Sequence, residues 1–251
     1  MKYPNLAFLL TFIFALAFHT NAQRSNPDYI ETNNGSLTIQ PIHHGTLVLS
    51  WNDISIFVDP TGGREAYEGL NNPDLILITH IHGDHMDIET LKALNTDQAT
   101  IIAPQSVTDR LPASLSGEVK ALANGEETGA NQIAVRAIPM YNLPDDSNSR
   151  HPKGRGNGYV LGIGGMNIYI SGDTEDIPEM RSLENIDVAF VCMNLPYTMD
   201  INQAASAVLD FKPKIVYPYH YRGQDTEAFK KLVNSQNKEI EVRLKNWYSD
   251  N

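Results

Sequence analysis

A cluster of metal-binding residue types directly follows an aliphatic run in this chain. Thr79-His80-Ile81-His82-Gly83-Asp84-His85 follows Leu75-Ile76-Leu77-Ile78, which has the composition of a buried strand. Because side chains alternate along an extended segment, His80 and His82 point to the same side and can reach one metal ion. Gly83 lets the chain turn, so Asp84 and His85 can face a second ion. Surface histidines beside a helix cap are the alternative, but such a dense cluster next to a strand favours a metal site.

The donor types indicate which metals the site would take. Imidazole with carboxylate is the set expected for zinc or a similar first-row metal, and paired ions of this kind are used in hydrolysis. Manganese and iron are also compatible with these donors. The sequence therefore predicts two ions per chain, zinc being favoured, with a metal-bound hydroxide attacking a carbonyl or phosphoryl group.

The motif His80-x-His82-x-Asp84-His85 at a strand end resembles the signature of the metallo-β-lactamase superfamily. The resemblance implies an α/β (mixed α+β) fold, an αββα four-layer sandwich of two mixed β-sheets flanked by helices. The superfamily includes lactonases, phosphodiesterases, nucleases and phospholipases as well as β-lactamases, so the fold leaves the substrate open. The segment Ile168 to Thr174, together with His220, is most similar to the branch containing ascorbate-6-phosphate lactonase and N-acyl-phosphatidylethanolamine phospholipase D.

Further donors are expected at the ends of later strands. Asp173 follows the strand-like Ile168-Tyr169-Ile170, and His220 follows Lys214 to Tyr219. The resemblance implies that the carboxylate of Asp173 bridges both metals and that His220 is the last histidine ligand. Asp84 and Asp173 are therefore the predicted catalytic carboxylates.

The third donor of the first metal is expected to be His151. Many members of the superfamily have a histidine after the strand that here ends at Met140, but this chain has Tyr141-Asn142 there. His151, in the long loop that follows, can reach back into the site because strands hold both ends of the loop. Solvent exposure of His151, with Asn142 or water at the metal, is the alternative. The predicted metal ligands are His80, His82, Asp84, His85, His151, Asp173 and His220.

Two further histidines, His43 and His44, precede Gly45 at the junction of two predicted strands. The superfamily carries a Gly-His pair in this region, near the mouth of the site. One of the two histidines is therefore expected to contact the substrate or a metal ligand, and a simple turn histidine is the alternative.

The N-terminal residues have the layout of a cleaved secretory signal. Lys2 supplies a positive charge, Leu6 to Phe18 is apolar, and Thr20-Asn21-Ala22 places small residues before a cut at Gln23. This predicts a signal peptide over 1–22 and one hydrolase domain over 23–251, exported to the periplasm or secreted. The 13-residue apolar run is shorter than the ~20 residues that span a bilayer, so no stable membrane insertion is expected after cleavage.

The composition limits the partners. The net charge is −11, and the chain has no basic stripe that could displace counterions from a nucleic acid. The expected partner is a small-molecule substrate.

Strand-like and helix-like segments alternate along the chain, as expected for one mixed domain. Residues 23–35 are polar and turn-rich and are expected to be loose, and Asn142 to Asn157 is expected to be a long functional loop. The predicted strands are Leu37–Ile42, Thr46–Trp51, Ile54–Val58, Leu75–Thr79, Ile101–Ile102, Ile133–Met140, Gly158–Ile163, Met166–Ile170, Val188–Met193, Lys214–Pro218 and Ile240–Leu244. The predicted helices are Ile88–Leu94 capped by Asp87, Ser106–Leu111, Ile177–Leu183, Ile201–Phe211 and Thr226–Ser235.

The sequence leaves three functions to compare. A metal-dependent hydrolase is favoured, whether it acts as a lactonase or amidase or as a phosphodiesterase or phospholipase D-like enzyme. A non-catalytic metal-binding protein that retains the fold is the second, and the intact ligand set argues against it. An iron oxidoreductase is the third, and the chain has no room for the flavodoxin-like domain that such relatives carry.

Overall fold

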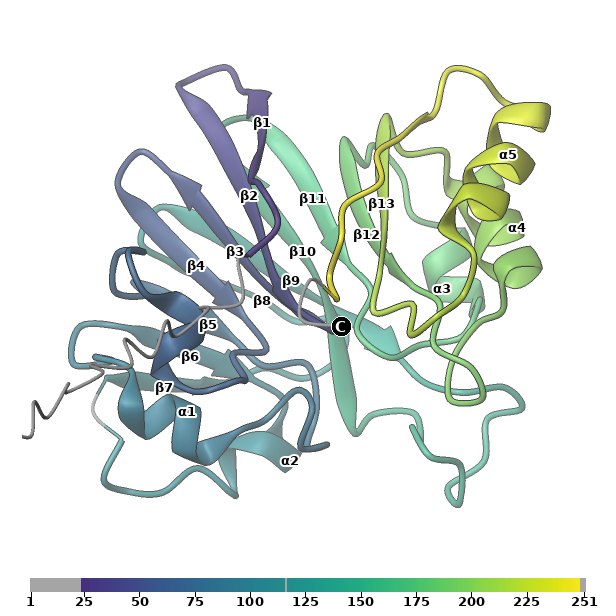
Figure 1. The fold of residues 1–251 in the computed structure, drawn as a ribbon. Helices are drawn as coiled ribbons and strands as arrows, with labels where there is room; N and C mark the ends of the chain where they lie inside the picture. The colour runs from purple at the N-terminus through teal and green to yellow at the C-terminus, as the bar shows by residue number, and fades with distance from the viewer. Residues whose placement is uncertain (1–23, 116, 249–251) are drawn as a thin grey trace, which may run out of the picture.

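Two seven-stranded β-sheets that face each other form the centre of the molecule (Figure 1). The computed structural model describes residues 24–115 and 117–248, and the predicted signal peptide 1–22 lies outside the described residues. The first sheet has its strands in chain order. They are β1 (Asp28–Glu31), β2 (Ser36–His43), β3 (Thr46–Trp51), β4 (Ile54–Val58), β5 (Leu75–Leu77), β6 (Thr100–Ala103) and β7 (Glu118–Ala121).

The second sheet contains the strands of the second half of the chain, again in sequence order from edge to edge. They are β8 (Glu127–Ala130), β9 (Ile133–Met140), β10 (Gly156–Ile163), β11 (Met166–Ile170), β12 (Val188–Cys192), β13 (Ile215–Tyr219) and β14 (Glu241–Val242).

The two halves repeat one pairing pattern. Strands β1 to β4 pair antiparallel and β4 to β7 pair parallel. In the same way, β8 to β11 pair antiparallel and β11 to β14 pair parallel. The carboxyl ends of the parallel strands in each sheet therefore lie along a common edge, where loops held by rigid strands can build a site.

The aliphatic run at β5 is buried on both faces, as its composition predicts. Leu75 and Leu77 pack in the core between the two sheets, whereas Ile76 and Ile78 pack in a second core on the outer face of the first sheet. This alternation follows from the period of two along a strand. It fixes the direction in which the chain leaves β5 toward the histidine motif.

Helices cover the outer faces of both sheets (Figure 1). The first sheet is covered by α1 and α2, and the second by α3, α4 and α5. Their bounds are α1 (Ile88–Ala93), α2 (Gln105–Thr108), α3 (Pro178–Arg181), α4 (Ile201–Phe211) and α5 (Thr226–Gln236), and a 3-10 turn, η1 (Arg64–Tyr67), precedes β5. These layers confirm the predicted αββα sandwich. In the part of the chain that the structure describes, no helix is both long and apolar enough to cross a membrane.

Several local predictions differ from the structure. The segment 23–35, expected to be loose, contains β1, whose residues Asp28 to Glu31 pair with Ser36 to Ile39 of β2. The edge strands β7 and β8 were not predicted, because their side chains are largely exposed and lack the alternation of a half-buried strand. The closing strand is two residues long, and α2 and α3 are each a single turn. Asp87 does cap α1, accepting hydrogen bonds from the backbone of Glu89 and Thr90.

Candidate metal centre

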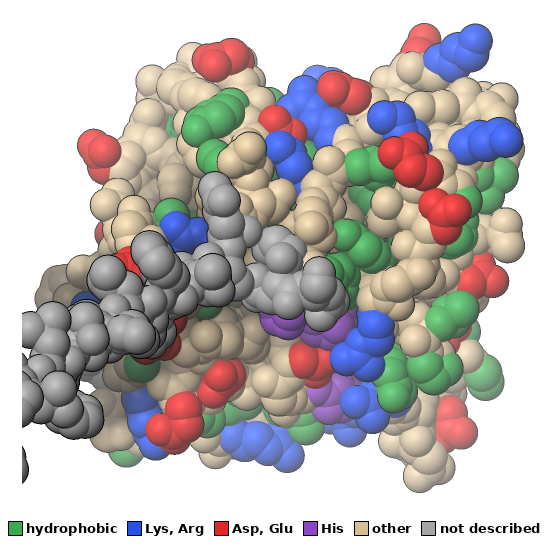
Figure 2. All heavy atoms as spheres, in the orientation of Figure 1, with side chains coloured by type: hydrophobic (Ala, Val, Ile, Leu, Met, Phe, Trp, Pro, Cys, Tyr) green, Lys and Arg blue, Asp and Glu red, His purple; other side chains and the backbone are tan. Residues whose placement is uncertain are grey.

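The predicted ligands lie together between the sheets, at the carboxyl ends of strands. His80, His82, Asp84 and His85 follow β5, while Asp173 follows β11. The remaining two predicted ligands are His220, directly after β13, and His151, in the loop between β9 and β10. All seven histidines of the described chain belong to this region, namely His43, His44, His80, His82, His85, His151 and His220. Figure 2 shows histidine side chains gathered near the lower middle of one face, with acidic and basic side chains beside them.

The first group of donors consists of three imidazoles. His82 Nδ1 lies 3.0 Å from His80 Nε2 and 3.2 Å from His151 Nε2. The side chain of His151 is buried, so the structure places it in the group rather than in solvent. Three nitrogen donors that converge in this way could hold one metal ion.

The second group combines imidazoles with a carboxylate. His85 Nε2 lies 3.0 Å from His220 Nε2, and His220 Nε2 lies 3.9 Å from Asp84 Oδ2. His44 Nε2 also approaches Asp84 Oδ2, at 3.2 Å. These donors could hold a second ion.

Asp173 lies between the two groups and divides its oxygens between them. Its Oδ1 is 3.1 Å from His220 Nε2 and 3.4 Å from His85 Nε2. Its Oδ2 is 3.5 Å from His151 Nε2 and 3.9 Å from His80 Nε2. Each oxygen of the Asp173 carboxylate therefore faces a different donor group.

A buried carboxylate at the end of β4, Asp59, supports the motif from behind. The Thr79 backbone N–H and hydroxyl donate to Asp59 Oδ1 and Oδ2, both at 2.7 Å. The His85 Nδ1–H donates to Asp59 Oδ2, also at 2.7 Å. Asp59 therefore holds both the start of the motif and one of its histidines. Asp59 was not among the site residues predicted from the sequence, although an Asp-Pro directly after a strand was the available signal.

The long loop is held by a reciprocal pairing between Asn142 and His151. The Asn142 N–H donates to the His151 carbonyl at 2.9 Å, and the His151 N–H donates to Asn142 Oδ1 at 2.9 Å. His151 Nδ1 lies 3.1 Å from the same Oδ1. The Asn142 amide NH2 donates to the Tyr197 carbonyl, which leaves Oδ1 as the atom facing His151. Asn142 thus orients His151.

The hydrogen-bond network shows which ring nitrogen of each histidine carries the hydrogen. The other nitrogen is then free to bind a cation, so these tautomers indicate whether a metal ion fits. Thr79 Oγ1 donates to Asp59, so it accepts from His80 Nδ1–H at 2.9 Å. His85 and His151 likewise use Nδ1–H toward Asp59 and Asn142. In their neutral forms, all three imidazoles therefore point an Nε2 lone pair at the centre of the site. His80 and His151 turn their Nε2 lone pairs toward Asp173 Oδ2, at 3.9 and 3.5 Å. A cation among these atoms would relieve the repulsion between them, so the donor set fits metal ions.

The pKa shifts agree with this reading. Burial lowers the pKa of His80 well below its ordinary value and lowers the pKa of His151 to about 4. Burial and then the Arg150 guanidinium lower the pKa of His82. These imidazoles are neutral at pH 7, as metal ligands must be. Burial opposes protonation of His85 too, but the carboxylates of Asp173 and Asp59 outweigh it and raise its pKa well above the ordinary value. In the absence of a metal, His85 therefore holds a second proton on Nε2 between these carboxylates, in the place that a metal ion would take.

Backbone conformation at the site is unusual. His44, Asp59 and His220 have φ values of 54°, 46° and 47°, in the left-handed region that side chains other than glycine rarely adopt. Such strain concentrates at functional sites. Gly45 permits the close packing, because a Cβ there would lie 2.9 Å from His85 Cε1.

The cavity in front of the second group has a volume of about 690 Å³ and is lined by His43, His44, Asp84, Tyr221, Arg222 and Tyr248, among others. In the loop that carries His151, Arg155 donates to the Arg150 carbonyl, and the Arg150 guanidinium lies 4.4 Å from the centre of the Tyr197 ring.

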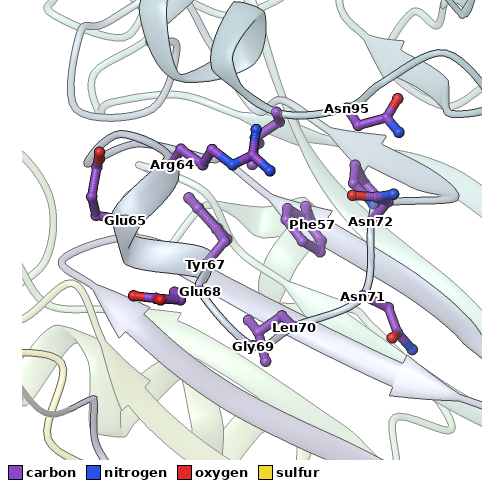
Figure 3. Close-up of a pocket in the computed structure, with 12 residues that line it drawn as sticks. Phe57, Arg64, Glu65, Tyr67, Glu68, Gly69, Leu70, Asn71, Asn72 and Asn95 are labelled. Carbon is purple, nitrogen blue, oxygen red and sulfur yellow. The ribbon is translucent and has the colours of Figure 1, made fainter.

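A separate pocket of about 390 Å³ lies beside η1 (Figure 3). Phe57 and Tyr67 form stacked rings in it, and Glu65 and Glu68 point away from its centre. No histidine is among the described residues that line it. It therefore lacks the donors of the metal centre.

Asp59→Asn tests the support behind the motif. Asparagine keeps the shape but cannot accept all three hydrogen bonds, so we expect the free energy of unfolding of the metal-free protein to fall by about 1–3 kcal/mol. Metal affinity should fall about 10–100-fold, as for other groups that orient ligands. Urea titration in EDTA measures the free energy of unfolding, and zinc competition measures the metal affinity.

Asp74→Asn is the control for Asp59→Asn, because Asp74 accepts from Ser55 N–H in the same sheet, away from the histidines. Wild-type zinc affinity in Asp59→Asn would contradict the assignment.

Comparison with known proteins identifies the family. A model of the β-lactamase superfamily domain matches residues 38–220. A UPF0173 metal-dependent hydrolase of Pyrococcus abyssi is 29% identical over 202 residues, covering 75% of this chain and 88% of that protein. A crystal structure of a candidate metal-dependent hydrolase from Parabacteroides distasonis is 39% identical with a TM-score of 0.79, covering 88% of this chain and 98% of that one. A metallo hydrolase from Ignicoccus hospitalis has the same fold, with 23% identity, a TM-score of 0.69 and coverage of 83% and 94%.

The family match begins in β2 and ends at His220, so it contains every predicted metal ligand. The similar proteins are metal-dependent hydrolases by name, and the donor geometry of this chain fits metal ions. The chain belongs to the metallo-β-lactamase superfamily and is a metal-dependent hydrolase.

Proposed function

We propose that the protein is an exported hydrolase that binds two metal ions per chain, zinc being favoured, and cleaves a small-molecule substrate at a carbonyl or phosphoryl centre. One observation carries the proposal. The two oxygens of Asp173 face two separate donor groups, which is the arrangement expected for a carboxylate shared by two ions.

The residues of the chain have distinct parts in this proposal. His80, His82 and His151 would hold one ion. Asp84, His85 and His220 would hold the other, with Asp173 shared. Bound metal ions would activate water and polarise the oxygen of the scissile group. Asp59 and Asn142 keep the imidazoles of His85 and His151 in the tautomer that presents Nε2, which is how outer hydrogen bonds commonly support metal ligands.

Metal content tests the number of ions. We expect elemental analysis of protein purified without chelators to give about two equivalents of transition metal per chain, because two donor groups are present. Protein treated with EDTA and reloaded with zinc, manganese or iron one at a time identifies the element that supports turnover. Folded protein that contains one equivalent or less after reloading would contradict the dinuclear site.

A substrate panel tests the reaction. Lactones, amides, simple esters and phosphodiesters distinguish the alternatives, and protein stripped with EDTA is the control for each. Turnover that is lost with the metal and restored by reloading supports the proposal. Stoichiometric metal without turnover on any class would favour a non-catalytic metal-binding protein.

Export is tested on the native protein. If residues 1–22 are a signal peptide, mass spectrometry should show a mature chain that begins at Gln23. A control with Ala22 replaced by a large charged residue should retain the N-terminal segment, because the cut needs small residues next to it. A mature chain that begins at Met1 would contradict the predicted compartment.

A further inference from the structure

The C-terminal residues return to the metal centre. Trp247 is fully buried, and its Nε1–H donates to the Thr46 carbonyl at 3.2 Å. The His44 N–H donates to the Trp247 carbonyl at 3.0 Å. These contacts bring Tyr248 beside His44, although Tyr248 lies outside the 38–220 range that matches the family model.

A chain of hydrogen bonds then leads from Tyr248 to the second donor group. The Arg222 backbone N–H donates to Tyr248 Oη at 2.8 Å, and Tyr248 Oη lies 2.9 Å from His44 Nδ1. His44 Nε2 lies 3.2 Å from Asp84 Oδ2. All of these side chains line the same cavity.

The direction of each hydrogen bond in this chain follows from counting the hydrogens that Tyr248 and His44 can donate. The Tyr248 oxygen already accepts from Arg222, and its single hydrogen can be donated to His44 Nδ1. His44 then carries its own hydrogen on Nε2 and donates it to Asp84. The opposite tautomer would place a nitrogen lone pair against a carboxylate oxygen at 3.2 Å, which is repulsive.

Asp84 needs such a restraint. Its side chain is 38% exposed, whereas the side chain of Asp173 is 4% exposed and is held on both sides. His44 itself is fixed, because its ring packs edge-on against the His220 ring with centroids 3.9 Å apart.

We propose that His44 is a positioning residue, held in its Nε2–H tautomer by Tyr248, which directs the Asp84 carboxylate toward the second donor group without itself being a metal ligand. The inference rests on the proposed function in one respect, that Asp84 binds metal. In this proposal, the C-terminal residues Trp247 and Tyr248 help to position a metal ligand.

Zinc competition against a chelator on the full-length mature protein tests the proposal. Because groups that orient ligands contribute about 10–100-fold to metal affinity, His44→Ala should weaken one of the zinc equivalents by about that factor. His44→Gln should recover most of the affinity, since its amide N–H can donate to Asp84 from a similar position but its nitrogen has no lone pair for a metal. The zinc affinity of Tyr248→Phe should lie between that of the wild type and that of His44→Ala. His43→Gln is the matched control. His43 lines the same cavity but makes no hydrogen bond to Asp84 in the described structure, so both zinc equivalents should be unchanged.

A second measurement does not depend on metal. Nitrogen-15 NMR of the metal-free protein should show His44 as the Nε2–H tautomer, with the signal identified by its loss in His44→Gln. An Nδ1–H tautomer, wild-type affinity in His44→Ala, or no recovery in His44→Gln would each overturn the inference. Wild-type protein that binds no zinc would contradict the proposed function instead, and the tautomer would still decide whether Tyr248 sets the orientation of His44.

Discussion

Asp173→Asn is expected to reduce turnover by at least about 100-fold, because even groups that only orient metal ligands contribute 10–100-fold. Asparagine keeps the volume of the side chain but loses its charge. Its NH2 would point hydrogens at one of the two imidazole groups, where the aspartate presents an oxygen to each. Activity with metal in excess and elemental analysis together measure the effect, and we expect the variant to contain fewer metal equivalents than wild type.

Asp176→Asn is the matched control for this variant. Asp176 lies three residues further along the same loop, where it pairs with Arg181 at 2.5 Å, away from the imidazoles. It should retain both metal and turnover. Turnover within a few-fold of wild type in Asp173→Asn, in a protein with an unchanged circular dichroism spectrum, would disprove the shared role of Asp173.

His151→Ala is expected to weaken the first metal equivalent by about 100-fold or more, because one of three converging imidazoles is lost. The loop itself should keep its shape. The Asn142 N–H donates to the backbone carbonyl of residue 151, and the backbone N–H of residue 151 donates to Asn142 Oδ1, so neither bond needs the imidazole. Metal content and turnover measured on the same sample report the loss of the ligand.

His43→Ala is the control for His151→Ala, since it removes an imidazole from the rim without removing a donor from either group. The His43→Ala variant should bind two equivalents of metal. If His151→Ala retains both metal content and turnover, His151 is not a ligand. Asn142 or water would then complete the first group, and the other ligand assignments would be unaffected.

The repeated strand pattern explains how one edge of the molecule holds so many donors. In each half, a parallel set of strands ends at the same edge, and the two sheets pack face to face. The loop after β5 therefore meets the loops after β11 and β13. The backbone N–H of Asn157 at the start of β10 donates to the Thr79 carbonyl at 2.9 Å, which ties the two sheets together beside the site.

Local patterns accounted for the elements with strongly apolar sequences. The nearly continuous apolar runs of β3, β4 and β5 predicted these strands, because each buries one face between the sheets and the other beneath a helix or loop. The strands β1, β7 and β8 could not be found in this way. They lie at or near sheet edges, where few side chains are buried and pairing with a neighbour, rather than composition, makes the strand.

The sequence was enough to predict the donor types of the site, because the motif His80 to His85 gives these types and their order within six residues. It also determined the family, through the same motif together with Asp173 and His220. The packing of the two sheets decided between the two alternatives for His151, and it brought Tyr248 to the site, which the sequence had not indicated. His151 meets His82 across 69 residues, and Tyr248 meets His44 across 204. The physical reason is that such contacts depend on how two sheets pack and where their loops return, and no short pattern in the chain encodes that packing.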